Sequence, residues 1–273
     1  MVMEEQMEHS IRILQITDLH LFGDKQKTLV GINPYRSLQK VLNEVKLDIQ
    51  TRKPDLIVFT GDISQDFSEA SYEIAAQIFA ELSCPFIITL GNHDREEMAK
   101  HLFPDFDAIA QKSPHIGNWH IITLNSHWLD HVNGLLTEKE LTFLEKELNA
   151  ANNEPTMIFL HHQAWETQCL WINRIGVSNR DAFMKIIENH TNIKAVICGH
   201  IHHETFMHLN GIDFRSTPST CWQFTPETNE FKLDRAMPGY RTLDLFANGT
   251  YATKIIRVNF DQELVPDLKS TGY

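Results

Sequence analysis

The fold is decided by the stretch Phe86-Ile87-Ile88-Thr89-Leu90-Gly91-Asn92-His93-Asp94. It joins a short apolar run, typical of a strand covered on both faces, to a turn that carries an amide, an imidazole and a carboxylate. Other apolar runs along the chain are also followed by Asp or His, either directly or after a single glycine. The sequence therefore predicts an α/β protein whose strands deliver polar side chains to one edge of a sheet.

Apolar runs of this kind alternate with segments of helical periodicity. The predicted strands are Ile11–Thr17, Leu56–Thr60, Phe86–Leu90, Trp119–Asn125, Thr156–Leu160 and Ile193–Cys198. The predicted helices are Tyr35–Thr51, Ala70–Leu82, Thr137–Asn149 and Asp181–Asn189. After residue 200 the pattern changes to alternating strands around Asn210-Gly211 and Asn248-Gly249, which favour hairpins. We expect antiparallel strands over residues 203–260, within a single domain 1–273.

Composition excludes several classes of protein. The 273 residues carry 24 Lys and Arg against 36 Asp and Glu, and the net charge of −12 argues against nucleic-acid binding through phosphate contacts. No apolar run approaches the roughly 18 residues that a membrane span needs. Met1–Ser10 is polar and acidic, unlike a signal peptide. We expect a cytoplasmic protein, monomer or homodimer, with reduced and buried thiols at Cys84, Cys169, Cys198 and Cys221.

The ends of the strands carry the chemistry. Five strands end in Asp18-Leu19-His20, Gly61-Asp62, Gly91-Asn92-His93-Asp94, His161-His162 and Gly199-His200-Ile201-His202-His203. One polar residue at a strand end commonly just begins a turn, but five with the same ligand chemistry at one edge predict a site. In Asp18-x-His20 and His200-x-His202, the spacing of two is expected to place both side chains on the same side of an extended backbone.

The residue types indicate transition metals. Carboxylate and imidazole without thiolate suit Fe, Mn, Zn or Co rather than a structural zinc site. Two ions about 3.5–4 Å apart form the clamp used in displacement at phosphorus. The seven candidate ligands exceed the need of one four-coordinate ion and fit two ions that share a carboxylate: Asp18, His20, Asp62, Asn92, His161, His200 and His202. Gly61, Gly91 and Gly199 are expected where a Cβ would obstruct the approach of another segment.

In this order, the five blocks resemble the calcineurin-like metallophosphoesterases. The resemblance implies a four-layer α/β/β/α sandwich with two mixed sheets and a dinuclear metal centre between them. It implies that His93 contacts the phosphate and protonates the leaving oxygen. It also implies a first metal held by Asp18, His20, Asp62 and His202, a second held by the bridging Asp62 with Asn92, His161 and His200, and substrate contacts from His20, Asp62, Asn92, His93 and His202.

Three stretches, the first of them within the fifth block, look like the bacterial 3′,5′-cyclic-AMP phosphodiesterases of this superfamily. They are residues 199–202, 217–224 and 238–241. The resemblance implies hydrolysis of cyclic AMP to 5′-AMP by metal-bound hydroxide, with His93 as general acid and with Fe or Mn, or alternatively Zn or Co, as cofactor. A metallophosphoesterase of broader or different phosphodiester or pyrophosphate specificity is the alternative, and a sensor without turnover is a second.

The fourth block departs from the family pattern. Many relatives follow the ligand histidine with His-Pro, whereas Gln163-Ala164 follows His161-His162 here. This leaves a choice between His161, which we prefer, and His162 as the ligand. The loop that follows contains Trp165 and Trp171, and either indole could stack on a purine or pack on the core.

Overall fold

The computed structural model describes residues 10–103, 113–259 and 265–272. The described residues leave out most of the N-terminal segment Met1–Ser10, which the sequence indicated to be unlike a signal peptide. They also leave out Tyr273 and the last position of the expected strand region 203–260. Within the described part of the chain, no helix combines the length and the apolar character needed to cross a bilayer.

The first sheet has five strands in the order β13-β12-β1-β2-β3. The three N-terminal strands run parallel to one another, and β12 and β13 add an antiparallel hairpin beside β1. Their bounds are β1 (Ile11–Ile16), β2 (Leu56–Thr60), β3 (Phe86–Thr89), β12 (Gly239–Leu245) and β13 (Tyr251–Arg257). The predicted hairpin at Asn248-Gly249 joins β12 to β13, so this prediction is confirmed.

The second sheet has six strands in the order β4-β5-β6-β7-β9-β8. They are β4 (His115–Ile116), β5 (Trp119–Thr123), β6 (Thr156–Leu160), β7 (Ile193–Cys198), β8 (Thr205–Leu209) and β9 (Ile212–Ser216). The hairpin β8-β9 turns at Asn210-Gly211 as predicted, but β9 also pairs in parallel with β7. The C-terminal part is therefore not wholly antiparallel, and both sheets are mixed. A two-stranded ribbon, β10 (Gln223–Phe224) with β11 (Leu233–Asp234), stands apart.

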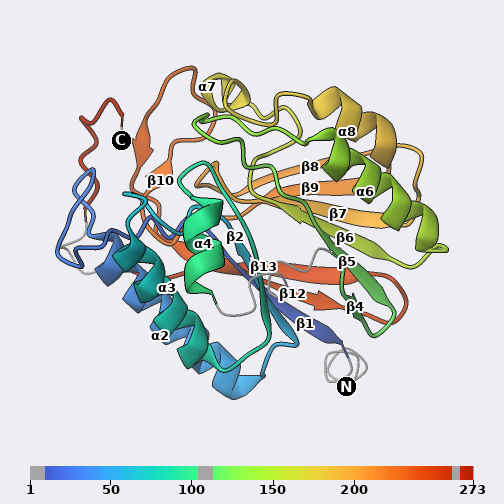
Figure 1. The fold of residues 1–273 in the computed structure, drawn as a ribbon, viewed down its shortest axis with the longest axis horizontal. Helices are drawn as coiled ribbons and strands as arrows, with labels where there is room; N and C mark the ends of the chain where they lie inside the picture. Colours follow the sequence, from blue (N-terminus) through green and yellow to red (C-terminus); the bar gives the residue numbers. More distant parts are fainter. Residues whose placement is uncertain (1–9, 104–112, 260–264, 273) are drawn as a thin grey trace.

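Helices cover the outer face of each sheet (Figure 1). The first sheet is covered by α2 (Pro34–Thr51) and α3 (Glu69–Leu82), with α4 (Glu96–Leu102) beside them. The second sheet is covered by α6 (Glu138–Ala150) and α8 (Arg180–Ile187), and α7 (Leu170–Asn173) is a single turn. Capping residues fix where these helices begin: Asn33, Ser68 and Thr137 accept hydrogen bonds from the first turns of α2, α3 and α6.

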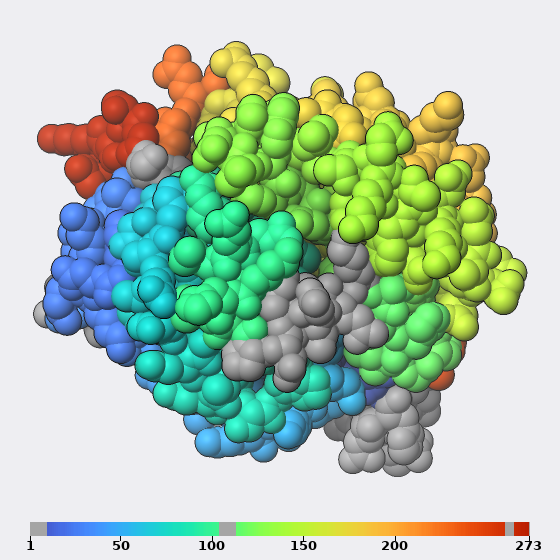
Figure 2. Space-filling view, viewed as in Figure 1, coloured from blue at the N-terminus to red at the C-terminus, as the bar shows by residue number. Residues whose placement is uncertain are grey.

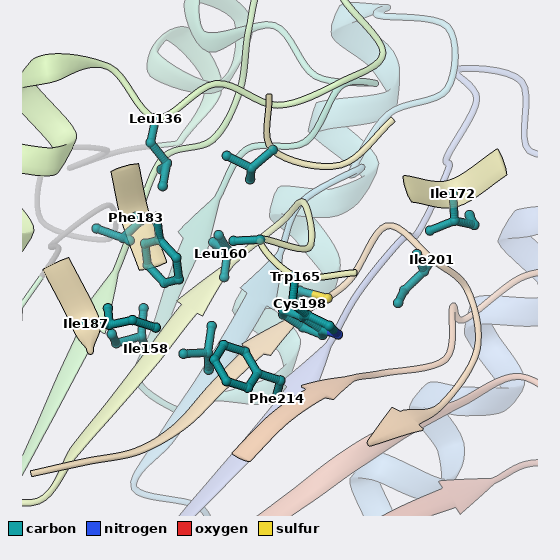
Figure 3. Close-up of a cluster of buried hydrophobic side chains, with 14 of the residues drawn as sticks. Leu136, Ile158, Leu160, Trp165, Ile172, Phe183, Ile187, Cys198, Ile201 and Phe214 are labelled. Atoms are coloured by element: carbon teal, nitrogen blue, oxygen red, sulfur yellow. The ribbon is translucent and has the colours of Figure 1, made fainter. Parts of the chain in front are cut away.

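Three buried apolar clusters define four layers. One cluster lies between the sheets and includes Val58 and Phe159. A second joins the first sheet to α2 and α3. The third joins the second sheet to α6 and α8, and Figure 3 shows Phe183 and Ile187 of α8 against Ile158. The predicted α/β/β/α sandwich is confirmed. In Figure 2 residues before about 100 adjoin residues of about 120–190 across one face of the molecule, and the C-terminal residues, in red, lie beside the N-terminal part.

The four cysteines are free and buried, as the sequence predicts. Burial raises the pKa of the Cys221 thiol, whose Sγ lies 3.0 Å from the Leu19 carbonyl oxygen. Burial raises the pKa of the other three thiols as well, and buried thiols of this kind are poor nucleophiles.

Candidate metal centre

Five of the seven predicted ligands lie in tight left-handed turns just beyond the strands. Asp18, His20, Asp62, His200 and His202 all have positive φ, between 46° and 64°. The expectation that an extended backbone aligns Asp18 with His20 and His200 with His202 is therefore wrong, because β1 ends at Ile16 and β7 ends at Cys198. A left-handed conformation costs about 1–2 kcal/mol for an ordinary residue, and such strain is concentrated at functional sites.

One group of side chains brings four candidate ligands together. One ligand atom each from Asp18, His20, Asp62 and His202 lies within 4.8 Å of the others. The Nε2 atoms of His20 and His202 are 3.0 Å apart, and His202 Nε2 is 3.2 Å from Asp18 Oδ1. All four side chains are fully buried. Two carboxylates and two imidazoles thus converge on one point, as predicted for the first metal.

Asp62 links this group to a second one. Its Oδ2 atom is 3.7 Å from His20 Nε2 and 3.4 Å from His161 Nε2. His161 Nε2 is also 3.3 Å from Asn92 Oδ1. Ligand atoms of His161, His162 and His200 lie within 4.8 Å of one another. A single carboxylate oxygen therefore faces both groups, which is the geometry that a bridging ligand requires.

Unpaired polar atoms in this region fit a bound cation. Within the described residues, Asp62 Oδ2 and both ring nitrogens of His200 are buried without a hydrogen-bond partner. A buried polar atom without a partner costs about 1–3 kcal/mol, so three together need an explanation. Carboxylate and imidazole are ligands for Fe, Mn, Zn and Co. The residues present therefore fit a transition-metal centre.

Outer hydrogen bonds orient the histidines. The Nδ1 atoms of His20, His161 and His202 lie 2.7, 2.6 and 3.0 Å from Gln65 Oε1, the Thr60 carbonyl and the Trp222 carbonyl, respectively. Each of these contacts leaves Nε2 facing the site. Metal-binding histidines are generally held in this way by a partner on the second ring nitrogen.

The two histidines of the fourth block differ in their surroundings. His162 uses both ring nitrogens, with Nδ1 2.8 Å from Ser126 Oγ and Nε2 3.2 Å from the Val132 carbonyl. His161 instead turns Nε2 toward Asp62 and Asn92. This geometry favours His161 over His162 as a ligand.

Burial and the carboxylates set the charges of the site. Burial lowers the pKa values of His20 and His200 to about 3, which keeps both imidazoles neutral and able to coordinate. Burial acts in the same direction on His161, but the Asp62 carboxylate outweighs it and raises the pKa of His161 to about 9. The position facing Asp62 thus favours a positive charge.

Asp94 supports the turns of the site, a role that the sequence pattern does not predict. Its Oδ1 accepts hydrogen bonds from the backbone N–H of Ile63 (3.0 Å) and from the Tyr72 hydroxyl (3.1 Å), and its Oδ2 accepts one from Gly91 N (2.9 Å). Asp94 therefore ties the turn that carries Asp62 to the turn that carries Asn92. The only signal in the sequence is its place at the end of the third block.

The glycines of the second and third blocks stand where these turns meet. Gly61 has φ +85°, and a Cβ there would lie 2.6 Å from the backbone nitrogen of Gly91. A Cβ on Gly91 would collide with Asp62 Oδ1. The expectation that a Cβ would obstruct a close approach is confirmed at both positions.

His93 lies beside the candidate ligands. Its backbone N–H donates to Asp62 Oδ1 at 2.8 Å, and its ring meets the His20 ring edge-on with centroids 5.1 Å apart. Burial lowers the pKa of His93, and the Asp62 carboxylate opposes that shift. The arrangement places a titratable imidazole at the border of the site.

The aromatic residues around the site have separate roles. Trp222 and Phe224 pack on the His20 and His202 rings, with centroid distances of 4.7 and 4.4 Å, respectively. Trp165 is 4% exposed within the apolar cluster of the second sheet. This burial favours packing in the core over stacking on a purine. Trp171 packs against Phe224 with ring centroids 5.0 Å apart.

Comparison with known proteins identifies the class. Residues 11–204 match the family model for calcineurin-like phosphoesterases. This match spans more than half of the chain and includes all five sequence blocks. The chain belongs to the calcineurin-like phosphoesterase family.

Individual proteins are similar to this chain over nearly its whole length. The chain is 37% identical over 267 residues to the 3′,5′-cyclic adenosine monophosphate phosphodiesterase CpdA of Escherichia coli (strain K12), covering 97% of this chain and 96% of that protein. It is 34% identical over 256 residues to a 3′,5′-cyclic-nucleotide phosphodiesterase of Nostoc sp., covering 94% and 96%. A dimetal phosphatase from Danio rerio has the same fold, with a TM-score of 0.66 at 14% identity over 91% of this chain and 99% of that one.

Proposed function

We propose that this chain hydrolyses 3′,5′-cyclic AMP to 5′-AMP at a dinuclear metal centre. The observation that carries the proposal is the single buried oxygen of Asp62, which faces both groups of histidines. The near full-length similarity to a cyclic AMP phosphodiesterase supports the substrate. We assign one ion to Asp18, His20, Asp62 and His202, and the other to Asp62, Asn92, His161 and His200.

When bound, two such ions supply Lewis acidity and lower the pKa of water, which provides a nucleophile near neutral pH. The water oxygen forms a bond to phosphorus while the bond between phosphorus and the 3′ oxygen breaks. His93 then delivers a proton to the departing 3′ oxygen, which leaves 5′-AMP as product. The backbone hydrogen bond from His93 to Asp62 holds the imidazole next to the reacting phosphate. We expect His20, Asp62, Asn92 and His202 to contact that phosphate as well.

Several wider assignments accompany this proposal. The histidine and carboxylate donors accept Fe or Mn, and availability decides between them and Zn or Co. Four free, buried cysteines are consistent with a reducing compartment such as the cytoplasm. We propose a single domain that acts as a monomer or a homodimer on a small-molecule substrate.

The proposal is tested by multiple-turnover hydrolysis of 3′,5′-cyclic AMP with the metal-loaded protein and separation of 5′-AMP from 3′-AMP. We expect 5′-AMP alone, with turnover abolished by a chelator and restored by added metal. Cleavage of a nitrophenyl phosphodiester without cleavage of cyclic AMP would contradict the substrate assignment and favour a broader phosphodiesterase. Formation of 3′-AMP would contradict the assigned leaving group.

A further inference from the structure

We propose that Phe67, beneath the guanidinium group of Arg95, is the platform on which the nucleobase of the substrate stacks. This inference rests on the proposed function, because it concerns the part of a cyclic nucleotide that the metal-binding side chains do not recognise.

The backbone of Phe67 is strained. Its φ is 57°, in a region that a bulky side chain rarely adopts. Its N–H donates to Ser64 Oγ at 2.8 Å, and Asp66 Oδ1 accepts hydrogen bonds from Ser68 in the same turn. These bonds hold an unfavourable conformation, and the ring remains exposed, with 37% of the residue accessible. An observed outlier of this kind at the border of a site points to function.

The guanidinium of Arg95 lies over one face of the ring, so the two groups form a stacked pair. Its central carbon lies 4.1 Å from the centroid of Phe67. The guanidinium forms an ion pair with the exposed Asp130 at 2.9 Å, and the backbone N–H of Arg95 donates to the Tyr72 hydroxyl at 2.7 Å. Aromatic rings and guanidinium planes are the surfaces on which unpaired bases stack in nucleic-acid complexes.

The platform lies next to the position assigned to the phosphate. The rings of Phe67 and His93 are nearly parallel, at 8°, with centroids 6.3 Å apart. His93 in turn meets the ring of His20, one of the assigned ligands. In a 3′,5′-cyclic nucleotide a single ribose separates the phosphate from the base. A phosphate bound beside His93 therefore brings the base within reach of Phe67.

Stacking predicts a particular kind of specificity. It uses the face of the base rather than its edge, and adenine and guanine present faces of similar size. We therefore expect the platform to favour purine over pyrimidine 3′,5′-cyclic nucleotides and to contribute little to the choice between the two purines.

The test compares Phe67→Ala and Phe67→Trp with the unmodified protein, all loaded with metal. The substrates are 3′,5′-cyclic AMP and methyl riboside 3′,5′-cyclic phosphate, which lacks a base. We expect Phe67→Ala to raise the KM for cyclic AMP about tenfold and to leave both kinetic constants for the base-free substrate unchanged. Phe67→Trp should retain the low KM.

Phe206 offers a matched control on β8. It is also an exposed phenylalanine, 58% accessible, with the guanidinium carbon of Arg215 4.2 Å from its centroid. Phe206→Ala should leave the KM for cyclic AMP unchanged. An equal loss on both substrates in Phe67→Ala would overturn the proposal, because the ring would then only position His93. An unchanged KM for cyclic AMP would overturn it as well.

A binding measurement separates this proposal from the proposed function. If the unmodified protein hydrolyses neither cyclic substrate, the proposed function fails, and the platform is judged by calorimetry with 5′-AMP and ribose 5-phosphate. A preference for 5′-AMP that Phe67→Ala removes would support the platform. A preference that the substitution leaves unchanged, or no preference at all, would overturn it.

Discussion

At the scale of single residues, substitution of the assigned proton donor should lower turnover without removing metal, unlike substitution of an assigned ligand. His93 touches His20 through its ring and Asp62 through its backbone, but it is not one of the converging ligand groups. We expect His93→Ala to lower kcat for cyclic AMP about 10²- to 10⁴-fold, the usual contribution of general acid catalysis. Metal content, measured by mass spectrometry of the purified protein, should not change.

The control for this prediction is His208→Ala. His208 is an exposed histidine on β8 that pairs with Asp213, so its loss should change neither kcat nor metal content. Loss of metal in His93→Ala would mean that His93 is a ligand and that its assigned role is wrong.

The residue types of the site could be predicted from the sequence, but the backbone that presents them could not. Asp18 and His20 converge because their N–H groups bond to the carbonyls of Gly61 and Asp62, which lie some forty residues away. These contacts impose the left-handed turns at Asp18 and His20, and no local pattern announces them. The role of Asp94 is hidden for the same reason, since its partners come from other turns.

At the scale of elements, the bounds of the strands could be predicted more accurately than the pairing between them. β2, β6 and β7 have the predicted bounds, because short apolar runs between turn residues mark strands that are covered on both faces. The parallel pairing of β9 with β7 was not predicted, because pairing depends on contacts that are distant in sequence. The short helices α4 and α7 were not predicted, because helices of one or two turns give too little periodicity.

The capping residue of α6 gives a testable prediction at this scale. Thr137 accepts a hydrogen bond from the backbone N–H of Glu140 at 3.3 Å, at the first turn of the helix. Thr137→Ala should lower the free energy of unfolding by about 1 kcal/mol, measured by urea denaturation. Thr137→Ser keeps the hydroxyl and should cost less. Equal losses in both variants would show that the cap does not stabilise the helix.

At the scale of the whole molecule, the layer between the sheets holds the two halves of the metal centre together. The first sheet carries Asp18, Asp62 and Asn92 at its strand ends, and the second carries His161, His200 and His202. Phe159 of β6 is fully buried in the cluster between the sheets. The geometry of the site therefore depends on packing well away from it.

Phe159→Ala tests this dependence. We expect a loss of about 3–5 kcal/mol in the free energy of unfolding, because the substitution removes a large buried side chain and leaves a cavity. Denaturant unfolding measures the loss, and the exposed Phe206→Ala serves as the control, with an expected loss below about 1 kcal/mol. Similar losses in the two variants would contradict the assigned core.

The central claim is a dinuclear centre that shares Asp62, and the most direct measurement is the number of metal ions bound per chain. The account predicts two ions in the unmodified protein and at most one in Asp62→Ala, because both ions lose a ligand. Asp213→Ala, which removes a carboxylate paired with Arg215, should keep two. One ion in the unmodified protein, or two ions retained in Asp62→Ala, would contradict the claim.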